Sequence, residues 1–242
     1  MRIGLWCCIV LAAAGSGCVL NVGGGRGPAE RPGKLTELTE SVELPQAEMV
    51  SVELGMGAGE LTVQGGAAKL MEGRFEYNIP AWKPDIRYEE SGFRGRLTVK
   101  QGAGTAVMGE TQNRWAIRFS EKPPIDLEVK CGAGESKLDL RGLNLRSVQA
   151  KMGAGRVEID LRSEHQRDFE VNVEGGVGEA TIRLPKALPV EARARGGIGK
   201  IHVEGLVKEE DGLWVSGAKG RDKSGIRLNV KGGIGEINIY AE

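Results

Sequence analysis

The sequence predicts an all-β protein, a right-handed, single-stranded β-solenoid built from rungs of about 21–23 residues with Gly-x-Gly corners. Three observations predict this fold: a recurring Gly-x-Gly motif, apolar alternation on both sides of it, and a glycine-rich composition with few aromatic residues. Successive central copies of the motif lie about 21–23 residues apart, a spacing typical of stacked repeats. The seven copies begin at Gly57, Gly102, Gly132, Gly153, Gly176, Gly197 and Gly233.

The strands on either side of each motif are predicted from alternation with a period of two. Apolar residues stand at Ile125, Leu127 and Val129 before one motif, and at Val157 and Ile159 after another. Such alternation indicates strands with one buried face. Each rung is therefore predicted to be two strands joined at a glycine corner, and its apolar face is buried only when neighbouring rungs stack on it.

Two columns of corner residues are predicted to share the core. Where the middle residue of the motif is Ala, the residue before the motif is larger, and where it is Val or Ile, that residue is Gly. Compensation of this kind is expected if both side chains point into one closely packed interior. The pairs run from Met56 and Ala58 to Gly232 and Ile234, and Cys131 belongs to the column of Met56 as a small buried residue.

The polar residue after each corner alternates in charge over the last five motifs. If the rungs stack in sequence order, about 4.8 Å apart, each charge is flanked by opposite charges, which helps to set the register. The alternative is that these are unrelated exposed charges, because surface pairs often contribute little. In sequence order the residues are Glu135, Arg156, Glu179, Lys200 and Glu236.

Two segments interrupt the repeat. Residues 65–101 are rich in aromatic side chains and are predicted to cover the first end of the stack. Residues 206–225 contain Asp211-Gly212 between apolar runs, which predicts a hairpin insertion. Residues 226–240 are expected to form the end rung, so the hairpin either caps that rung or belongs to an interaction surface. The candidate interaction residues are Trp214, Leu213 and Tyr240, and the candidate partner is an envelope protein or a second copy, bound at the C-terminal edge by strand addition.

The N-terminal part is predicted to be a leader and a tether. Residues 1–17 combine a basic start, a short apolar run and small residues, which is typical of a secretory signal. Residues 18–40 are rich in Gly, Pro and charge and are predicted to be flexible, and residues 41–242 form the predicted folded domain. The leader resembles that of bacterial lipoproteins, which implies lipid attachment at Cys18. An ordinary cleaved signal followed by a chance cysteine is the alternative.

Composition and motifs argue against several classes of function. Lys and Arg together equal Asp and Glu, 33 each, so no net positive charge attracts nucleic acid. Cys131 is the one cysteine after Cys18, so neither a disulfide nor a cysteine zinc site is expected. No nucleophile, metal-binding or phosphate-binding motif is found, and His165 and His202 are expected to be solvated. The sequence therefore predicts no catalytic residue, no cofactor and no metal.

The corner motifs and their strands resemble the toast-rack domain of LiaF-like cell-wall-active-antibiotic response proteins and related adhesin-like proteins. The resemblance implies an envelope β-solenoid, in some members linked to sensing of cell-wall damage, and it supplies no catalytic residues. Membrane-embedded members carry transmembrane helices before the domain, where this chain has a leader and a tether. The similarity covers roughly residues 41–242 and is carried by residues 53–61, 65–67, 114–118, 124–135, 138–143 and 233–237.

These expectations combine into a non-enzymatic bacterial envelope lipoprotein that presents a rigid solenoid for protein interaction, in cell-wall stress sensing or in adhesion. It is expected to be lipid-anchored in the cell envelope, on the periplasmic side of the outer membrane or on the cell surface. Val19, rather than Asp, after the lipidated cysteine favours the outer membrane in a double-membraned bacterium. The alternative is a glycan-binding or glycan-cleaving solenoid, which a line of exposed aromatic residues along one face would favour; Trp82, Trp115 and Trp214 are the candidates.

Overall fold

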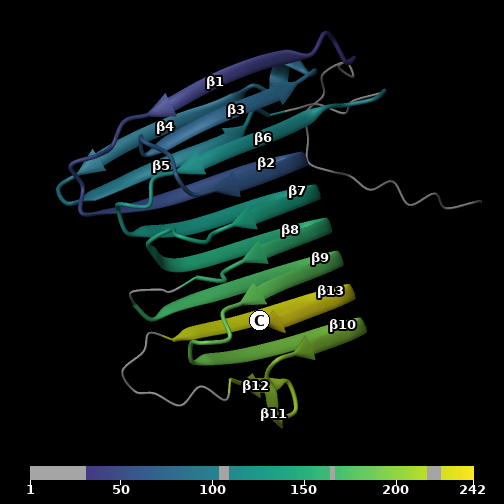
Figure 1. Cartoon of the computed structure of the whole chain (residues 1–242). Coiled ribbons are helices and arrows are strands. Elements are labelled where there is room, and N and C mark those ends of the chain that lie inside the picture. The colour runs from purple at the N-terminus through teal and green to yellow at the C-terminus, as the bar shows by residue number, and fades with distance from the viewer. Residues whose placement is uncertain (1–30, 104–108, 164–166, 217–224) are drawn as a thin grey trace, which may run out of the picture.

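A single 13-stranded sheet, wound into a stack of bent rungs, makes up most of the described chain (Figure 1). The computed structural model describes residues 31–103, 109–163, 167–216 and 225–242. Apart from the short 3-10 helix Pro80–Trp82, its regular elements are strands. The prediction of an all-β repeat fold is confirmed.

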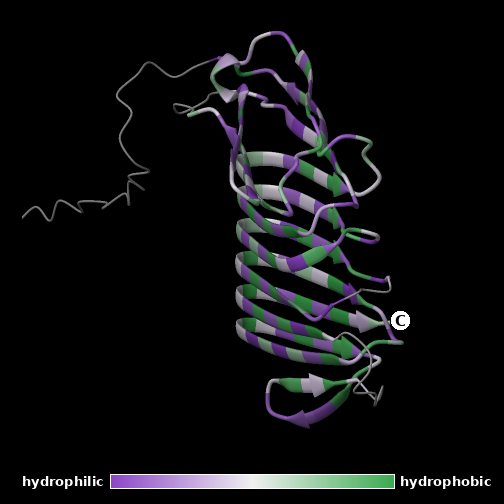
Figure 2. Cartoon of the chain, turned by 90° about the vertical axis from the view of Figure 1, so that its left-hand side faces the viewer, coloured by the Kyte–Doolittle hydropathy of each residue, from purple (hydrophilic) through white to green (hydrophobic). Residues whose placement is uncertain are grey.

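Each central rung is one long strand that bends at its Gly-x-Gly motif, so that its two halves face each other across a core (Figure 2). We call the half before the bend the first arm and the half after it the second arm. Both arms pair in parallel with the same arms of the next rung. The central rungs are β2 (Met49–Gln64), β7 (Ile125–Asp139), β8 (Leu145–Asp160), β9 (Phe169–Leu184), β13 (Ile226–Ala241) and β10 (Val190–Glu204).

At the first end of the stack, the two arms are built by separate strands. The first arm continues from β2 to β5 (Arg94–Gln101) and β4 (Pro84–Ser91), and the second arm to β6 (Asn113–Phe119), β3 (Met71–Tyr77) and β1 (Thr36–Val42). β1 pairs with β3 from Thr36 onward, so the sheet includes five residues of the segment expected to be tether. The remaining hairpin, β11 (Val207–Glu210) and β12 (Leu213–Val215), lies at the opposite end of the stack (Figure 1).

The rung that carries the motif at residues 102–105 is not one continuous bent strand. β5 ends at Gln101 and β6 begins only at Asn113, so this rung is split, and Gly104 and Thr105 lie outside the described residues. At this split, two amide side chains take the place of strand backbone in bonding to the corner of β2. The Gln101 Oε1 accepts the Gly57 N–H at 2.8 Å, and the buried Asn113 donates its Nδ2 to the Ala58 carbonyl, also at 2.8 Å. Amide side chains can substitute for a strand here because each offers both a donor and an acceptor.

The order of the last rungs differs from the order in the sequence. β13 lies between β9 and β10 and pairs with both in parallel, so the expectation that residues 226–240 form the end rung is wrong. Polar contacts explain this position. Asn229 donates to Asn172 and Glu170 of β9 at 3.1 and 3.0 Å, and Glu242 forms ion pairs with Arg162 and Arg183 at 2.8 Å. The end rung of the stack is β10.

The same rearrangement changes which of the charged residues after the corners are neighbours. Arg156 lies between Glu135 and Glu179 as expected, with N–O distances of 3.9 and 3.1 Å. Glu236, however, is in register with both Glu179 and Lys200, so two glutamates are neighbours. Asn238 donates a hydrogen bond of 3.0 Å to Glu179. The prediction of strict alternation is therefore wrong at this rung.

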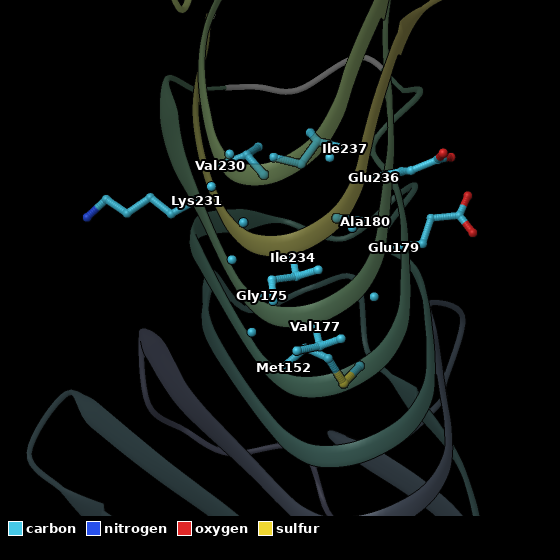
Figure 3. Close-up of a pocket in the computed structure, with 18 of the residues that line it drawn as sticks. Met152, Gly175, Val177, Glu179, Ala180, Val230, Lys231, Ile234, Glu236 and Ile237 are labelled. Carbon is cyan, nitrogen blue, oxygen red and sulfur yellow. The ribbon is translucent and has the colours of Figure 1, made fainter.

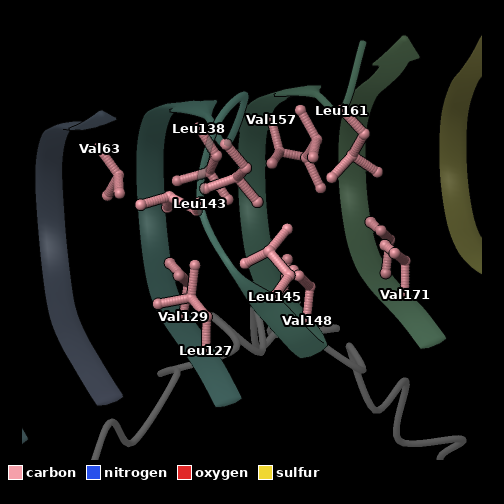
Figure 4. Packing of buried hydrophobic residues seen from close by; sticks show 14 of the residues in the cluster. Val63, Leu127, Val129, Leu138, Leu143, Leu145, Val148, Val157, Leu161 and Val171 are labelled. Atoms are coloured by element: carbon pink, nitrogen blue, oxygen red, sulfur yellow. The ribbon is translucent and has the colours of Figure 1, made fainter. Parts of the chain in front are cut away.

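The core fills the space between the arms along the whole stack. Apolar side chains from both arms meet there, and Leu143 in the loop after β7 joins them (Figure 4). The column before the corners points inward as expected, since Met56, Cys131 and Met152 are buried. The middle residues of the corners point outward instead, so the two columns do not share the core. Val177 and Ile234 are each 53% exposed, and Ile198 is 71% exposed.

Candidate interaction surface

The end formed by β10 leaves one strand edge largely uncovered. β12 pairs with the first arm of β10 only over Glu191–Arg193, and Ala194 donates its N–H to the Gly212 carbonyl at 3.1 Å. Within the part of the chain that the structure describes, no strand pairs with the outer edge of β10 from Arg195 to Glu204. An open edge of this kind offers backbone donors and acceptors to another strand.

Exposed apolar side chains gather at the same end. Among the described residues, five of the eight large hydrophobic side chains that are exposed belong to the last three rungs or to the hairpin. Val177, Ile234 and Ile198 are in register on neighbouring rungs and form a ridge along the outside of the bends. Figure 3 labels the first two of them. Ile201 on the second arm and Val207 in β11 are 38% and 61% exposed. We call the free edge of β10 together with these five side chains the end surface.

Behind the ridge, the corner is less densely filled than elsewhere. Gly175 replaces the methionine of the preceding rung, and a Cβ on Gly175 would have no atom within 4 Å. The neighbouring inward position on the second arm holds only Ala180, and a cavity of about 80 Å³ lies there. Val230 and Ile237 point into the space between the arms and border it (Figure 3).

The structure places the three predicted interaction residues on different parts of this end. Leu213 and Trp214 lie in β12, beside the first arm, whereas Tyr240 lies on the second arm of β13, in register with Glu204. Trp214, expected to be exposed, is half-buried against the core, with Lys208 Nζ 5.8 Å from its ring. The ring of Tyr240 lies between His202 and the guanidinium of Arg183, at 5.7 and 5.5 Å.

Sequence reasoning missed the residues of the ridge. Val177, Ile198 and Ile234 carried a signal, since each is a branched apolar residue where the other corners have Ala, but that signal was assigned to the core. Leu213, Trp214 and Tyr240 are all partly covered by neighbours. The end surface is therefore built mainly from residues that the sequence had not singled out.

The charged groups of this end are unevenly paired. Lys208 and Asp211 form an ion pair of 3.1 Å in the hairpin, and His202 Nε2 lies 3.8 Å from Glu204 Oε2. Among the described residues, Arg195 and Lys200 have no ion-pair partner, although both are exposed. The free edge thus carries unpaired positive charge beside its apolar side chains.

The described residues offer little for chemistry. They contain no group of three or more His, Cys, Asp or Glu side chains that could hold a metal ion. Burial raises the pKa of the Cys131 thiol, which contacts the Ala133 carbonyl at 3.6 Å, so this cysteine is a poor nucleophile. Trp82 and Trp115 are buried, and no line of exposed aromatic residues runs along the part of the stack that the structure covers. Within the same residues, no helix has the length and apolar character needed to span a bilayer.

The fold defines a class of protein: a stacked-repeat scaffold whose end strand leaves an edge open within the described residues. The family can be named as well. A family model described as the N-terminal domain of toast_rack, DUF2154, matches residues 31–183, and the chain belongs to the toast-rack family. No protein in the curated set matches the sequence.

Two solved structures illustrate the similarity. The chain is 34% identical to a "putative cell adhesion protein" from Clostridium sporogenes ATCC 15579, with a TM-score of 0.82, over 86% of this chain and 100% of that one. It is 12% identical to a "putative adhesin" from Bacteroides fragilis NCTC 9343, with a TM-score of 0.35, over 86% of this chain and 99% of that one. The first similarity supports the fold along most of the stack, and the second is too low to support an argument.

Proposed function

We propose that this protein is a non-enzymatic adhesion protein of the bacterial cell envelope and that it binds its partner through the end surface. The observation that carries the proposal is the open edge of β10 beside the exposed side chains of Val177, Ile234 and Ile198. Large branched side chains in neighbouring positions are rarely left in water unless a partner covers them. The similarity to a protein described as a putative cell adhesion protein supports the same class of function.

The position of the end surface fits a protein that is anchored at its other end. Gly33 donates its N–H to the Asn78 carbonyl at 2.7 Å, which holds the first described residues beside β1 and β3. The end surface lies across the whole stack from there (Figure 1). A lipid on Cys18 would therefore present the end surface away from the membrane. Sensing of cell-wall stress would use the same surface to bind a signalling partner in place of an adhesive one.

Adhesion can be tested with the whole chain immobilised on beads through its N-terminus. We expect the triple variant Val177→Lys, Ile198→Lys, Ile234→Lys to bind bacterial cells at least about tenfold less than the unchanged protein, because lysines cannot be buried in an apolar contact. All three positions are exposed, so the fold should be unaffected. Phe93→Lys is the matched control, since Phe93 is 53% exposed at the other end. Equal binding by the triple variant and the unchanged protein would contradict the proposal.

Anchoring is a separate prediction. Cys18→Ser should move the protein from the membrane fraction to the soluble fraction and should abolish incorporation of a labelled fatty acid, because the thiol is the site of lipid attachment. The measurement is fractionation of cells with an antibody to the folded domain. If the variant stays in the membrane fraction and still carries label, the protein is not anchored through Cys18. That result would not change the prediction for the binding of cells to protein-coated beads.

A further inference from the structure

We propose that the partner of the end surface is a second copy of this chain, bound end to end around a two-fold axis perpendicular to the stack. The inference rests on the proposed function, because it names the partner of the same surface. Three independent features of the end carry it: its stepped shape, the direction of its strands, and the distribution of its charges and apolar side chains.

The end of the stack has the shape of a step. The first arm of β10 carries two further strands, β12 and β11, whereas the described residues place no strand on the second arm. If a two-fold axis runs along the line that bisects the bend, the first arm of one copy lies over the second arm of the other copy. Each hairpin then lies over the bare second arm of the other copy. The hairpin of one copy fills the space over the second arm of the other copy, and the symmetry axis produces this contact twice.

The strand directions permit backbone pairing in this arrangement. β12 is antiparallel to the first arm of β10, and β11 is antiparallel to β12, so β11 runs toward the bend. The second arm of β10 runs away from the bend. The axis preserves the direction toward the bend, so β11 meets the partner's second arm as an antiparallel strand. Antiparallel neighbours form regular hydrogen bonds, and within the described residues neither of these two edges is paired with another strand.

The charges of the two contacting parts are opposite. The tip of the hairpin carries Glu209, Glu210 and Asp211, and among the described residues only Asp211 has an ion-pair partner, Lys208. The second arm of β10 begins with Lys200 and His202, with Glu204 at its far end. Complementary charge of this kind favours one partner and one orientation.

The tip is placed to reach these residues. Gly212 bonds to Ala194 on the first arm, and Gly196 lies opposite Ile201 across the bend, where its Cβ would be 3.7 Å from the Ile201 side chain. The tip of one copy therefore lies at the level of residues 201–203 of the other. His202 lies within that level, and Lys200 and Glu204 lie on either side of it, so Lys200 and His202 are within reach of the glutamates.

Apolar side chains at the end become covered in the same contact. Ile198 lies at the bend, close to the axis, so the two copies of this residue lie on the same side of the dimer. Val207 in β11 faces the partner's second arm, where Ile201 is incompletely covered by its own chain. In a free copy, the side chains of Ile198, Val207 and Ile201 are 71%, 61% and 38% exposed to water.

The pairing has a consequence for adhesion. It directs the two N-terminal ends in opposite directions and places them on the order of 90 Å apart, at about 4.8 Å for each strand spacing. Two copies anchored on opposing surfaces can form this dimer with both stacks upright between the surfaces. The protein would then hold two surfaces together by binding to itself.

The test exchanges the charges of the two contacting parts in separate variants of the whole chain. The tip variant carries Glu209→Lys and Glu210→Lys, and the edge variant carries Lys200→Glu and His202→Glu. All four residues are exposed. Each variant alone places like charges together, so its self-association, measured by analytical ultracentrifugation in detergent, should weaken at least about tenfold. In a one-to-one mixture both contacts join opposite charges again, and association should return. Glu40→Lys with Glu89→Lys, at the other end, is the matched control.

Each result decides the question. Self-association of the unchanged chain, lost in both variants and restored in the mixture, supports the dimer. A monomeric unchanged chain, or a mixture that stays as weak as its components, overturns it. If the chain is monomeric but its beads still bind cells through Val177, Ile198 and Ile234, the proposed adhesion function stands and only the second copy is wrong. Circular dichroism of each variant checks that the fold is intact.

Discussion

Replacing Gly155 by alanine should unfold much of the stack. Gly155 has φ +127°, a conformation that residues with a Cβ rarely adopt, and a Cβ there would overlap the carbonyl oxygen of Gly134 in the rung before. Neither problem can relax, because the neighbouring corner lies directly against it on a hydrogen-bonded ladder. We expect a loss of more than about 4 kcal/mol and a fall of roughly 10 °C in the melting temperature measured by circular dichroism.

Gly175→Ala is the matched control for this prediction. It is also a corner glycine, but a Cβ on it would meet nothing within 4 Å and would begin to fill the cavity behind the ridge. Since alanine also reduces the freedom of the unfolded chain, this variant should gain about 0.5–1 kcal/mol. If the two variants were equally stable, close contact between the corners of neighbouring rungs would not be the reason that the corners require glycine.

Leu228→Asp should detach the whole end of the stack. Leu228 is 1% exposed, and it lies in register with Val171 of β9 and Ala192 of β10. An unpaired carboxylate in this core costs several kcal/mol, on the order of 4 or more. Because β13 is the strand that joins β10 to β9, its loss also frees β10 and the hairpin. Limited proteolysis followed by mass spectrometry should give a resistant fragment that ends near Leu184.

Arg227→Asp provides the comparison, because Arg227 is the adjacent exposed residue of the same strand. Introducing the same aspartate at this exposed position should leave the cleavage pattern unaltered. Cleavage of Leu228→Asp within β7 or β8, instead of beyond Leu184, would show that the rungs unfold together rather than from the end.

The local part of the fold could be predicted from the sequence because its signals are local. The glycines at the corners are required by backbone contact between neighbouring rungs, so every bent strand carries them at the same place. The direction of the middle residue could not be predicted by alternation. Strict alternation from the buried Cys131 would point Ala133 inward, but the positive φ of Gly134 shifts the phase, so that Ser136 is the next buried residue.

The order of the rungs and the end surface could not be predicted in the same way. β13 pairs with both β9 and β10 residue by residue. Because the repeats are equivalent, the local sequence of a rung does not indicate which rungs will lie next to it. The contacts that decide it, Asn229 with Asn172 and Glu242 with Arg183, join residues 57 and 59 positions apart in the sequence. The end surface depends on that order, because it determines that Lys200, Ile201 and His202 lie at an edge.

The position of β13 also bears on the order in which the protein can fold during synthesis. Rungs β7, β8 and β9 each pair with a rung made earlier, so they can be added one by one as the chain leaves the ribosome. β10 has no such template, since its parallel partner is synthesised after it. It must wait, with its hairpin, until β13 emerges and inserts between it and β9. A chain interrupted before residue 226 would keep a stable stack up to β9 but would lack the end surface, so the binding proposed for that surface would become available only when synthesis has passed β13.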